Sequence, residues 1–468
     1  MHIAVIGSGI SGLSSAWLLS RNHTVDIFEK DDRLGGHANT QTVETSTGAI
    51  DVDTGFIVYN ERTYPNLTRL FDHLEVDTAL SDMSFSASLR DSDQEYSGQG
   101  FKGLFAKPTN ALNPRFLRML TDIRRFYMEA PRDIETGHAQ SMTLEGYLKA
   151  NNYSDAFIHD HLVPMGAAIW CIPSEEMMKF PFEAFMRFSI NHGLVQFRNR
   201  PQWRTIPGGS KRYVEKIASH ISGEIHLNQA ITALVRRPGS VTIRTRQGLE
   251  KRYDHVVLAC HADQALQILG ASGSDMEEAE RATLASIPYH KNLAILHKDP
   301  ALMPRRRAAW ASWNYIQDRG TESQGETNEP RLCVTYWMNK LQPLACKDDL
   351  FVTLNPIDQP AEGTVLRSQL YHHPVFSMQA IKAQKQLWAL QGNRRTWFCG
   401  AYFGYGFHED GIQAGLAVAE QLGGSLRPWA LDDPSNRIFV YPPKAKPERH
   451  QPMSAKTEPL TEPLVVAK

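Results

Sequence analysis

The chain has little of what would place it in several common protein classes. Its 468 residues contain no run of 18 apolar residues, so no transmembrane helix is expected. The formal net charge is −1, which excludes a global field that would recruit nucleic acid. The five cysteines form no C-x-x-C pair, which argues against a zinc site and against a disulfide framework. A reduced, cytoplasmic environment fits this usage.

A secretory signal is also not expected. Strand-forming residues begin at His2, and a cleaved signal peptide cannot also be the first strand of a cofactor domain. The length allows two or three domains. From about Pro442 the chain is rich in Pro, Lys, Glu and Thr without apolar periodicity, and we expect 442–468 to be a disordered tail.

The most informative stretch is the N-terminus. A buried-type strand, His2 to Ile6, precedes Gly7-Ser8-Gly9-Ile10-Ser11-Gly12, and an apolar helix follows to about Leu19. A second strand, Thr24 to Phe28, is closed by Glu29. A G-x-G-x-x-G motif alone is a weak signal, but here its strand, its helix and an acid about 20 residues on are all present. The stretch therefore predicts a dinucleotide-binding βαβ unit.

Each element of this motif has a physical role. The first glycine allows a tight turn, the second lets backbone approach a pyrophosphate, and the third lets helix and strand pack closely. The helix N-terminus offers free N–H groups and a positive dipole end to the phosphates. Glu29 would accept hydrogen bonds from ribose hydroxyls. The predicted contact set is Gly7, Ser8, Gly9, Ile10, Ser11, Gly12, Glu29 and Lys30.

The next residues, Arg33-Leu34-Gly35-Gly36, favour FAD over NAD. Here the sequence resembles the flavin-containing amine oxidase and phytoene desaturase superfamily, whose members carry R-x-G-G after the ribose-binding acid. The resemblance implies that the segment through His37 follows the FAD pyrophosphate and ribose. Asp53-Thr54-Gly55-Phe56 is similar to the next landmark of that family, a turn running toward the flavin, with Gly55 and Phe56 as contacts.

Two later segments extend the resemblance. By position, Ile231 is the aliphatic residue whose backbone meets the adenine. Thr396 to Gly400, followed by Phe407 to Gly415, is similar to the C-terminal FAD motif, in which N–H groups at a helix start contact the flavin. This adds Gly400, Gly411 and Ile412 to the predicted cofactor contacts.

The implied fold is α/β (α+β overall). It has a Rossmann-type FAD-binding domain of the amine oxidase, glutathione reductase-like fold and an interleaved α+β substrate-binding domain. We expect the FAD domain to comprise 1–80, 200–265 and 390–430, and the substrate domain 81–199 and 266–389. Periodicity predicts helices at 64–74 and 114–130 and a capped helix start at Ser141, with strands at 84–89, 287–296, 309–315 and 334–339.

Two features of the middle of the chain have alternative interpretations. The helix from Pro114 to Ala130 is basic and amphipathic, so it either lies on an anionic membrane surface or packs on the core with solvated arginines. The aromatic and Met-rich stretch from Phe180 to Phe188 suits an apolar ligand, and it equally suits plain core. Met165 to Trp170 is either a channel wall or a buried helix.

Two positions depart from the amine oxidases that the chain resembles. Counted from Pro288 without gaps, the lysine that those enzymes place near flavin N5 falls on Ala294. One of the two aromatic rings that flank the amine falls on His408. No cysteine lies between Cys346 and Cys399, where one branch tethers its flavin, so FAD is expected to be non-covalent.

The pattern also includes Pro164 to Trp170, Asn191-His192-Gly193 and Gly406 to Gly411. With these segments the chain resembles a bacterial branch of predicted NAD/FAD-binding proteins that is often encoded beside cyclopropane-fatty-acid-synthase-type methyltransferases. This implies a small-molecule or lipid-acyl substrate, with an acyl-modifying methyltransferase as a candidate partner and peripheral contact with the inner membrane surface as an open alternative. We expect desaturation of an unsaturated or methyl-branched acyl chain, with His408 as catalytic base and Tyr289 as a weaker candidate. An amine oxidase producing H2O2 and a flavin-dependent isomerase are the alternatives, and no metal or nucleic acid is expected.

Overall fold

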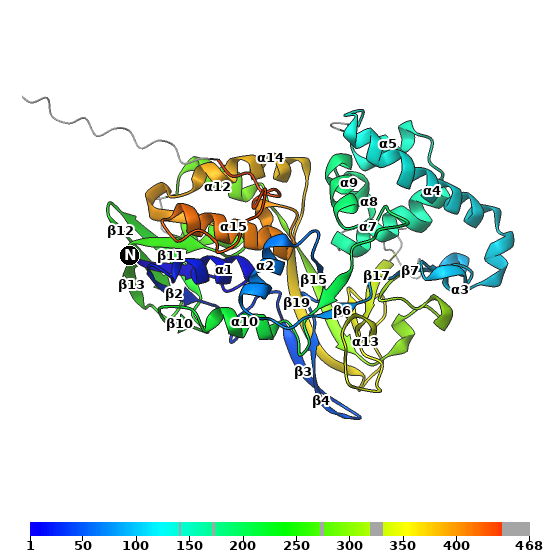
Figure 1. The fold of residues 1–468 in the computed structure, drawn as a ribbon, viewed down its shortest axis with the longest axis horizontal. Coiled ribbons are helices and arrows are strands. Elements are labelled where there is room, and N and C mark those ends of the chain that lie inside the picture. The colour runs from blue at the N-terminus through cyan, green and yellow to red at the C-terminus, as the bar shows by residue number, and fades with distance from the viewer. Residues whose placement is uncertain (140–141, 171–173, 272–275, 319–330, 442–468) are drawn as a thin grey trace, which may run out of the picture.

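The computed structural model describes residues 1–139, 142–170, 174–271, 276–318 and 331–441, which form two lobes (Figure 1). One lobe is built around a parallel sheet, and the other contains a larger mixed sheet and a group of helices. The expected helix start at Ser141, the cysteine Cys171 and the expected tail at 442–468 lie outside the described residues.

The parallel sheet has the strand order β10-β2-β1-β14-β20, and all of its neighbouring strands run parallel. Its strands are β1 (His2–Ile6), β2 (Thr24–Phe28), β10 (Ile225–His226), β14 (His255–Leu258) and β20 (Thr396–Phe398). The strands are mostly apolar and buried, as is expected when other elements cover both faces of a parallel sheet. They come from distant parts of the chain, which confirms the Rossmann-type sheet and the mixed α/β class.

Two helices from opposite ends of the chain pack closely beside this sheet, α1 (Ile10–Leu19) and α15 (His408–Gln421) (Figure 1). Gly415 makes their approach possible, because a Cβ there would lie 2.3 Å from the carbonyl oxygen of Ser11. Smaller elements complete this lobe. They are α2 (Pro65–His73), α10 (Lys211–Ala218), α11 (Ala262–Gly270), α12 (Glu278–Ala285), α14 (Met378–Leu387), β11 (Ile231–Arg237), β12 (Ser240–Thr245) and β13 (Glu250–Tyr253).

The mixed sheet has the order β19-β15-β18-β17-β16-β7-β8. Its strands are β7 (Phe85–Leu89), β8 (Gln94–Ser97), β15 (Tyr289–His297), β16 (Trp313–Asp318), β17 (Arg331–Trp337), β18 (Phe351–Leu354) and β19 (Val365–Pro374). The hairpin β3 (Thr40–Thr45) and β4 (Gly48–Asp53) and the small sheet of β5 (Tyr59–Asn60), β9 (Trp203–Thr205) and β6 (Ala79–Ser81) connect the two lobes. The predicted domain boundaries stay predictions.

The helical end of the second lobe has its own core. Its helices are α3 (Gly100–Leu104), α4 (Pro114–Glu135), α5 (Leu144–Ala150), α6 (Asp155–Phe157), α7 (Val163–Trp170), α8 (Ser174–Met178) and α9 (Phe182–Asn191), and α13 (Met338–Leu341) follows β17. The Phe180 to Phe188 stretch is packed into this core, with Phe182, Phe185 and Met186 fully buried. Most of its side chains are therefore structural. No helix in the described ranges has both the length and the apolar character needed to cross a bilayer.

Two sequence expectations need correction. The helix predicted to end at Ala130 continues through Pro131 to Glu135, because Phe126 and Ala130 are fully buried and their packing outweighs the lost N–H. The strand predicted from Ala309 begins only at Trp313. Asn314 is the reason, since its side chain hydrogen-bonds both the N–H and the carbonyl of Ala311, at 2.9 and 2.7 Å. Those groups are then unavailable to a neighbouring strand.

Candidate functional site

The glycine motif lies at the carboxyl end of the parallel sheet, where ligands of open α/β folds bind. Gly7 has φ +102°, and a Cβ there would lie 2.8 Å from the carbonyl oxygen of Ala259. A Cβ on Gly12 would lie 2.0 Å from the carbonyl oxygen of Gly7, so this residue must be glycine for helix and strand to meet. A Cβ on Gly9 would meet nothing within 4 Å. Gly9 therefore borders open space at the start of α1.

The start of α1 has free hydrogen-bonding capacity. Within the described residues no side chain caps it, and its first turn contains no acid. The N–H groups of a helix start are unsatisfied by the helix itself and attract anions. Ile10 and Ser11 are buried here, so their side chains serve the packing while the backbone faces the opening.

Glu29 closes the neighbouring strand and is buried. Its Oε2 accepts hydrogen bonds from the backbone N–H and the hydroxyl of Ser8, at 2.9 and 2.5 Å, and its Oε1 accepts from the N–H of Asp31 at 3.0 Å. The carboxylate is thus held beside the glycine motif. Lys30, the next residue, is exposed.

The loop after β2 folds back on the glycine motif. Arg33 donates to the carbonyl oxygens of Leu34, Gly36 and Ala38, at 3.3, 2.8 and 3.2 Å, and so braces the loop from within. The N–H of Gly35 reaches the carbonyl oxygen of Ser8 at 3.0 Å. A Cβ on Gly36 would lie 3.1 Å from the Cα of Gly9. Gly9 and Gly36 together form a side-chain-free cradle.

His37 connects this loop to the turn after β4. Its carbonyl oxygen accepts the N–H of Phe56 at 2.7 Å, and a Cβ on Gly55 would lie 2.3 Å from the same oxygen. The Nε2 atom of His37 is buried and has no hydrogen-bond partner among the described residues, and the ring centroid lies 5.0 Å from that of Tyr371. Burial lowers the pKa of His37 well below its usual range, so the imidazole is neutral.

Tyr371 and Asn39 belong to the site although sequence reasoning missed them. The hydroxyl of Tyr371 accepts from Asn39 Nδ2 at 2.8 Å and shares a hydrogen bond with Thr54 at 2.9 Å. The phenol thereby attaches β19 to the turn that carries Gly55 and Phe56. Tyr371 lies in a polar, exposed strand, and its sequence gives no pattern that would single it out.

His408 lies at the first turn of α15, where the C-terminal motif was expected. Its ring stacks on Phe56 with centroids 3.6 Å apart and planes 12° apart. Its Nε2 is 2.9 Å from the hydroxyl oxygen of Tyr213. Burial lowers the pKa of His408 to about 3 and raises the pKa of Tyr213 well above its usual range. A neutral imidazole and a protonated phenol therefore form this pair at neutral pH.

The acids that follow His408 have structural roles. Asp410 accepts the N–H of Phe407 at 2.8 Å and caps α15. Glu409 is fully buried and accepts the N–H groups of Asn66 and Leu67, both at 3.1 Å, at the start of α2. Two acids beside His408 are thus committed to helix ends.

The remaining residues that were predicted to contact the cofactor either leave the backbone accessible or pack in the core. A Cβ on Gly411 would lie 2.8 Å from Ile10, and Ile412 is fully buried between the helices. Gly400 follows β20 at the same sheet edge as Gly7. Ile231 begins β11, close to Gln229, whose N–H donates to the carbonyl oxygen of Glu29 at 2.8 Å.

Tyr289 contacts its neighbours at the start of α11. Its hydroxyl accepts the N–H of Ala262 at 3.2 Å, and its ring stacks on His261 with centroids 4.6 Å apart. Burial raises its pKa, so the phenol stays protonated. The structure brings His408, Phe56 and His37 into one continuous site, while Tyr289 packs at the start of α11. The role predicted for Tyr289 stays a prediction.

An aromatic enclosure adjoins His408 through Phe407. His192 stacks on Phe188 with centroids 3.8 Å apart, and Phe188 stacks on Phe407 at 4.7 Å. Nδ1 of His192 lies 3.0 Å from the carbonyl oxygen of Phe188, so it carries the proton and leaves Nε2 as an acceptor. That Nε2 is buried with no partner in the described part of the chain. This Nε2 is therefore a buried acceptor among aromatic rings.

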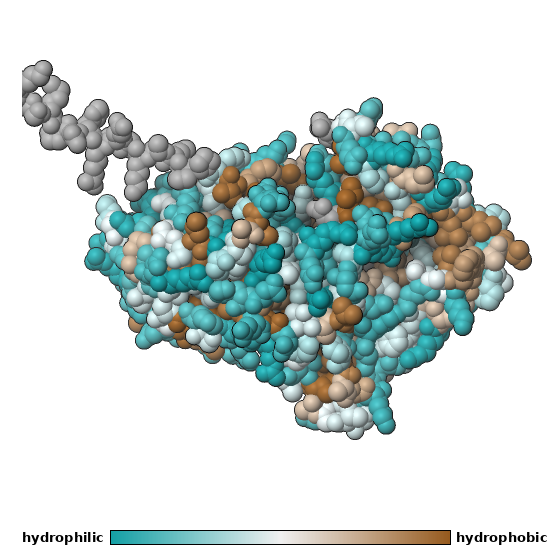
Figure 2. Space-filling view, in the orientation of Figure 1, coloured by the Kyte–Doolittle hydropathy of each residue, from teal (hydrophilic) through white to brown (hydrophobic). Residues whose placement is uncertain are grey.

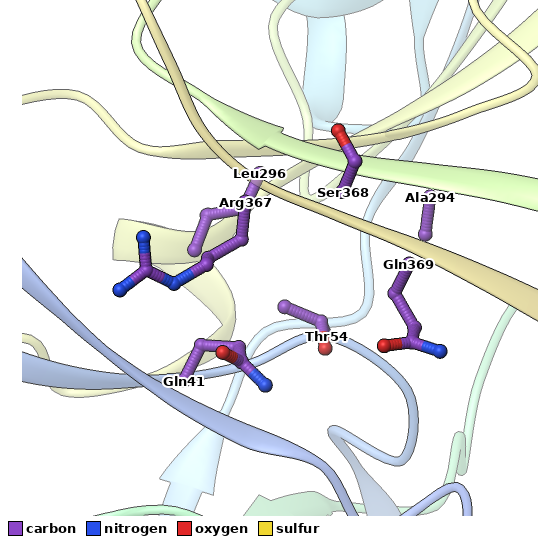
Figure 3. Close-up of a pocket in the computed structure, with 7 residues that line it drawn as sticks. All are labelled: Gln41, Thr54, Ala294, Leu296, Arg367, Ser368 and Gln369. Atoms are coloured by element: carbon purple, nitrogen blue, oxygen red, sulfur yellow. The ribbon is translucent and has the colours of Figure 1, made fainter.

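Ala294, the position expected to hold lysine in an amine oxidase, lines a small cavity beside the Thr54 turn (Figure 3). The cavity holds about 30 Å³, which suits one or two water molecules and is too small for a lysine side chain. Figure 3 shows Ala294 and Gln369 on the side of the mixed sheet and Gln41 and Thr54 on the opposite side. Ala294 and Thr54 therefore line the same cavity.

The hydrogen-bond donors and the side-chain-free positions at the carboxyl end of the parallel sheet fit a flavin dinucleotide. The uncapped start of α1 and the cradle at Gly9 and Gly36 suit a pyrophosphate, and the Glu29 carboxylate suits a ribose. The turn at Gly55 and the start of α15 lie further along the same edge, where the longer cofactor would continue.

Comparison with known proteins supports this assignment. A family model described as flavin containing amine oxidoreductase matches residues 10–290. Cyclohexylamine oxidase from Brevibacterium oxydans is 15% identical, with 90% of this chain and 99% of that chain covered at a TM-score of 0.63. Putrescine oxidase bound to putrescine is 12% identical, with 90% and 99% covered at 0.64. A CLA-producing fatty acid isomerase from P. acnes is 14% identical, with 90% and 97% covered at 0.58. These three likenesses concern the fold.

Proposed function

We propose that this chain, which belongs to the flavin containing amine oxidoreductase family, removes two hydrogens from an unsaturated or methyl-branched fatty acyl chain. It is an FAD-dependent oxidoreductase of that family; the acyl substrate is our proposal. The observation that carries it is Ala294, a methyl group on a water-sized cavity. An ungapped count from Pro288 puts the lysine of the amine oxidases that the chain resembles at this position.

The cofactor would be held without a covalent bond by Gly7 to Gly12, Glu29, Gly35 and Gly36. Burial raises the pKa of the Cys260 thiol, close to the glycine motif, to about 12. A protonated thiol is a poor nucleophile, so it would not attach to a flavin. When bound, the flavin supplies the hydride acceptor, and a second acceptor such as O2 restores it.

His408 is proposed to take the proton that leaves the substrate carbon. Its Nε2 faces the Tyr213 hydroxyl at 2.9 Å, so Nδ1 is the atom left for the substrate. Burial lowers the pKa of His408 to about 3, so the imidazole is neutral at physiological pH and Nδ1 can accept a proton, as a weaker base than a free imidazole. Stacking on Phe56 fixes the ring plane. The proton balance is then complete, with one hydride and one proton leaving the acyl chain.

The surroundings of His408 favour an apolar substrate. Phe407 precedes it in the chain and stacks on Phe188, which stacks on His192. The neighbouring acids are engaged elsewhere: Glu409 accepts from the start of α2, and Asp410 accepts the N–H of Phe407 and lies 3.6 Å from Arg437. A cationic amine would gain little in such an enclosure, because it would lose its hydration without gaining a free carboxylate. A hydrocarbon chain has no favourable hydration to lose when it is buried.

The test is anaerobic reduction of the purified holoenzyme. The flavin absorbance band should bleach with a methylated or unsaturated acyl phospholipid. The His408→Phe variant, which keeps a ring to stack on Phe56, should bleach 100-fold to 10,000-fold more slowly, about the usual contribution of a positioned base. Its flavin content should equal that of the wild type, which separates catalysis from cofactor binding.

Two results would refute the acyl proposal. Rapid bleaching by amines with peroxide formation in air, and none with acyl lipids, would identify an amine oxidase. Formation of a double-bond isomer without consumption of any acceptor would identify an isomerase. Both outcomes are compatible with the family assignment. They would mean that residues in the middle of the chain select a substrate or reaction other than the proposed one.

A further inference from the structure

Large apolar side chains are exposed at the corner where α3 and α4 meet. Leu112 is 85% exposed, Phe101 is 82% exposed, and Leu117 is 44% exposed. Figure 2 shows apolar atoms gathered at the end of the molecule where Figure 1 places α3. Single exposed apolar residues are ordinary, but a cluster of large ones usually marks an interaction site. We call Phe101, Leu112 and Leu117 the apolar corner.

The apolar corner is held by a rigid base. Phe101 stacks on Phe105 with centroids 6.3 Å apart, and Phe105 meets the fully buried Phe116 at 6.1 Å. Leu112 ends the short turn Pro108–Leu112, directly before Asn113, whose side chain caps α4. The exposed side chains are therefore displayed by a fixed frame.

Basic residues surround the apolar corner. Residues 100–130 contain six Lys or Arg (Lys102, Lys107, Arg115, Arg118, Arg124, Arg125) and two acids (Asp122, Glu129), a net charge of +4. The whole chain has a net charge of −1, so this segment is strongly enriched in positive charge. Within it Arg118 and Arg125 each lie 3.4 Å from Asp122. Two acids from outside the segment, Asp93 and Asp160, pair with Lys107 and Arg115 at 3.0 and 2.8 Å, so the surface with these acids included has a net charge of +2.

The exposed stripe of α4 continues the apolar corner. Leu117, Thr121, Arg124 and Met128 recur at helical spacing, and all four are exposed. The opposite face of the helix, with Phe116, is buried. The helix is therefore a core helix whose outer face, together with the α3 turn, carries apolar and basic groups.

We propose that this corner docks the protein on an anionic bilayer surface. Phe101, Leu112 and Leu117 would enter the boundary between headgroups and acyl chains, while the surrounding Lys and Arg contact lipid phosphates. A second copy of the chain is a poorer occupant, because a two-fold contact would set two patches of net charge +2 against each other. Anionic lipid supplies the charge that the corner lacks.

The test is co-sedimentation of the full-length holoenzyme with vesicles made of equal parts phosphatidylglycerol and phosphatidylcholine. The protein should sediment with these vesicles and be released by high salt, and it should bind pure phosphatidylcholine at least tenfold more weakly. The double variant Phe101→Ser/Leu112→Ser should weaken binding by a factor of about ten or more. Leu426→Ser is the matched control, because Leu426 is 77% exposed outside this corner, and it should bind as the wild type does.

Three outcomes would overturn the proposal. One is no binding to the anionic vesicles. Another is equal binding by the double variant and the wild type. The third is a dimer in sedimentation velocity that dissociates in the double variant. Equal thermal unfolding temperatures for all three proteins establish that the substitutions act on the surface. These readouts do not depend on the substrate, so the proposed function and the membrane surface stand or fall separately.

Discussion

Replacing Gly9 with alanine should separate cofactor binding from folding. Gly9 has φ −64° and ψ 176°, a conformation that alanine adopts without strain, and its Cβ would meet nothing within 4 Å. Alanine is a poorer N-cap than glycine but restricts the unfolded chain, and these effects oppose each other. The cofactor-free protein should therefore keep its stability within about 1 kcal/mol.

Flavin affinity should fall in the same variant. The new methyl group would occupy the space through which a pyrophosphate reaches the start of α1. Loss of two charge-assisted hydrogen bonds to backbone N–H groups would cost about 3 kcal/mol in total, or about 100-fold in dissociation constant. The assay is a titration of the apoprotein with FAD, followed by quenching of flavin fluorescence.

Two further variants frame this experiment. Gly12→Ala places a Cβ 2.0 Å from the carbonyl oxygen of Gly7, so it should lose both folding stability and flavin. Gly98→Ala is the matched control, since its Cβ also meets nothing within 4 Å and it lies outside the nucleotide cradle. If Gly9→Ala binds FAD as tightly as Gly98→Ala does, the pyrophosphate does not lie on Gly9 and the site is misassigned.

Three other predictions concern charge. Glu29→Gln should weaken FAD binding about tenfold to 100-fold while the fold persists, and unchanged affinity by the same titration would contradict the ribose role. Glu280→Gln should lower the free energy of unfolding by about 3 kcal/mol, measured by urea denaturation. The reason is that the side chains of Arg236 and Glu280 are 1% and 0% exposed and form an ion pair at 2.5 Å. A decrease below about 1 kcal/mol would count against this prediction. Burial lowers the pKa of His161 to about 4 and of His192 to about 3, so the unfolded chain binds more protons below pH 6.5. Stability should therefore fall as the pH drops from 6.5 toward 4, by up to about 1.4 kcal/mol per pH unit for each histidine, and a thermal unfolding temperature that stays constant from pH 7 to 5 would refute this.

The nucleotide cradle could be predicted because its signals are local. Gly7, Gly9 and Gly12 occupy fixed positions between one strand and one helix, and Glu29 follows the next strand. The geometry of a βαβ unit then leaves few alternatives. The capping role of Asp410 was predictable for the same reason, since a cap acts within one helical turn.

The environment of His408 could not be predicted in this way. Its partners Tyr213 and Phe56 are 195 and 352 residues away along the chain, and their own patterns mark them only as apolar or aromatic. The same holds for Tyr371, which meets Asn39 across 332 residues. Contacts of this range depend on how the two lobes are assembled, which no periodicity encodes.

The helix at 114–135 has some properties that were predictable from local sequence and others that depend on contacts distant in sequence. Its periodicity correctly indicated one buried face, and its arginines correctly indicated a basic outer surface. The sequence could not tell that Phe101 and Leu112, from outside the helix, are its most exposed apolar neighbours. Burial depends on what covers a side chain, and only the packing of α3 against α4 determines that.

The sequence by itself determined the cofactor class, because the glycines and the acid that bind a dinucleotide must follow one another at short, fixed spacing. Tertiary structure alone decided which side chains meet around His408 and Ala294. It placed Ala294 on a water-sized cavity, stacked His408 on Phe56, and buried most of the Phe180 to Phe188 cluster in the core. The physical reason is range: backbone conformation is set by neighbours in sequence, whereas burial, pKa and cavity size are set by neighbours in space.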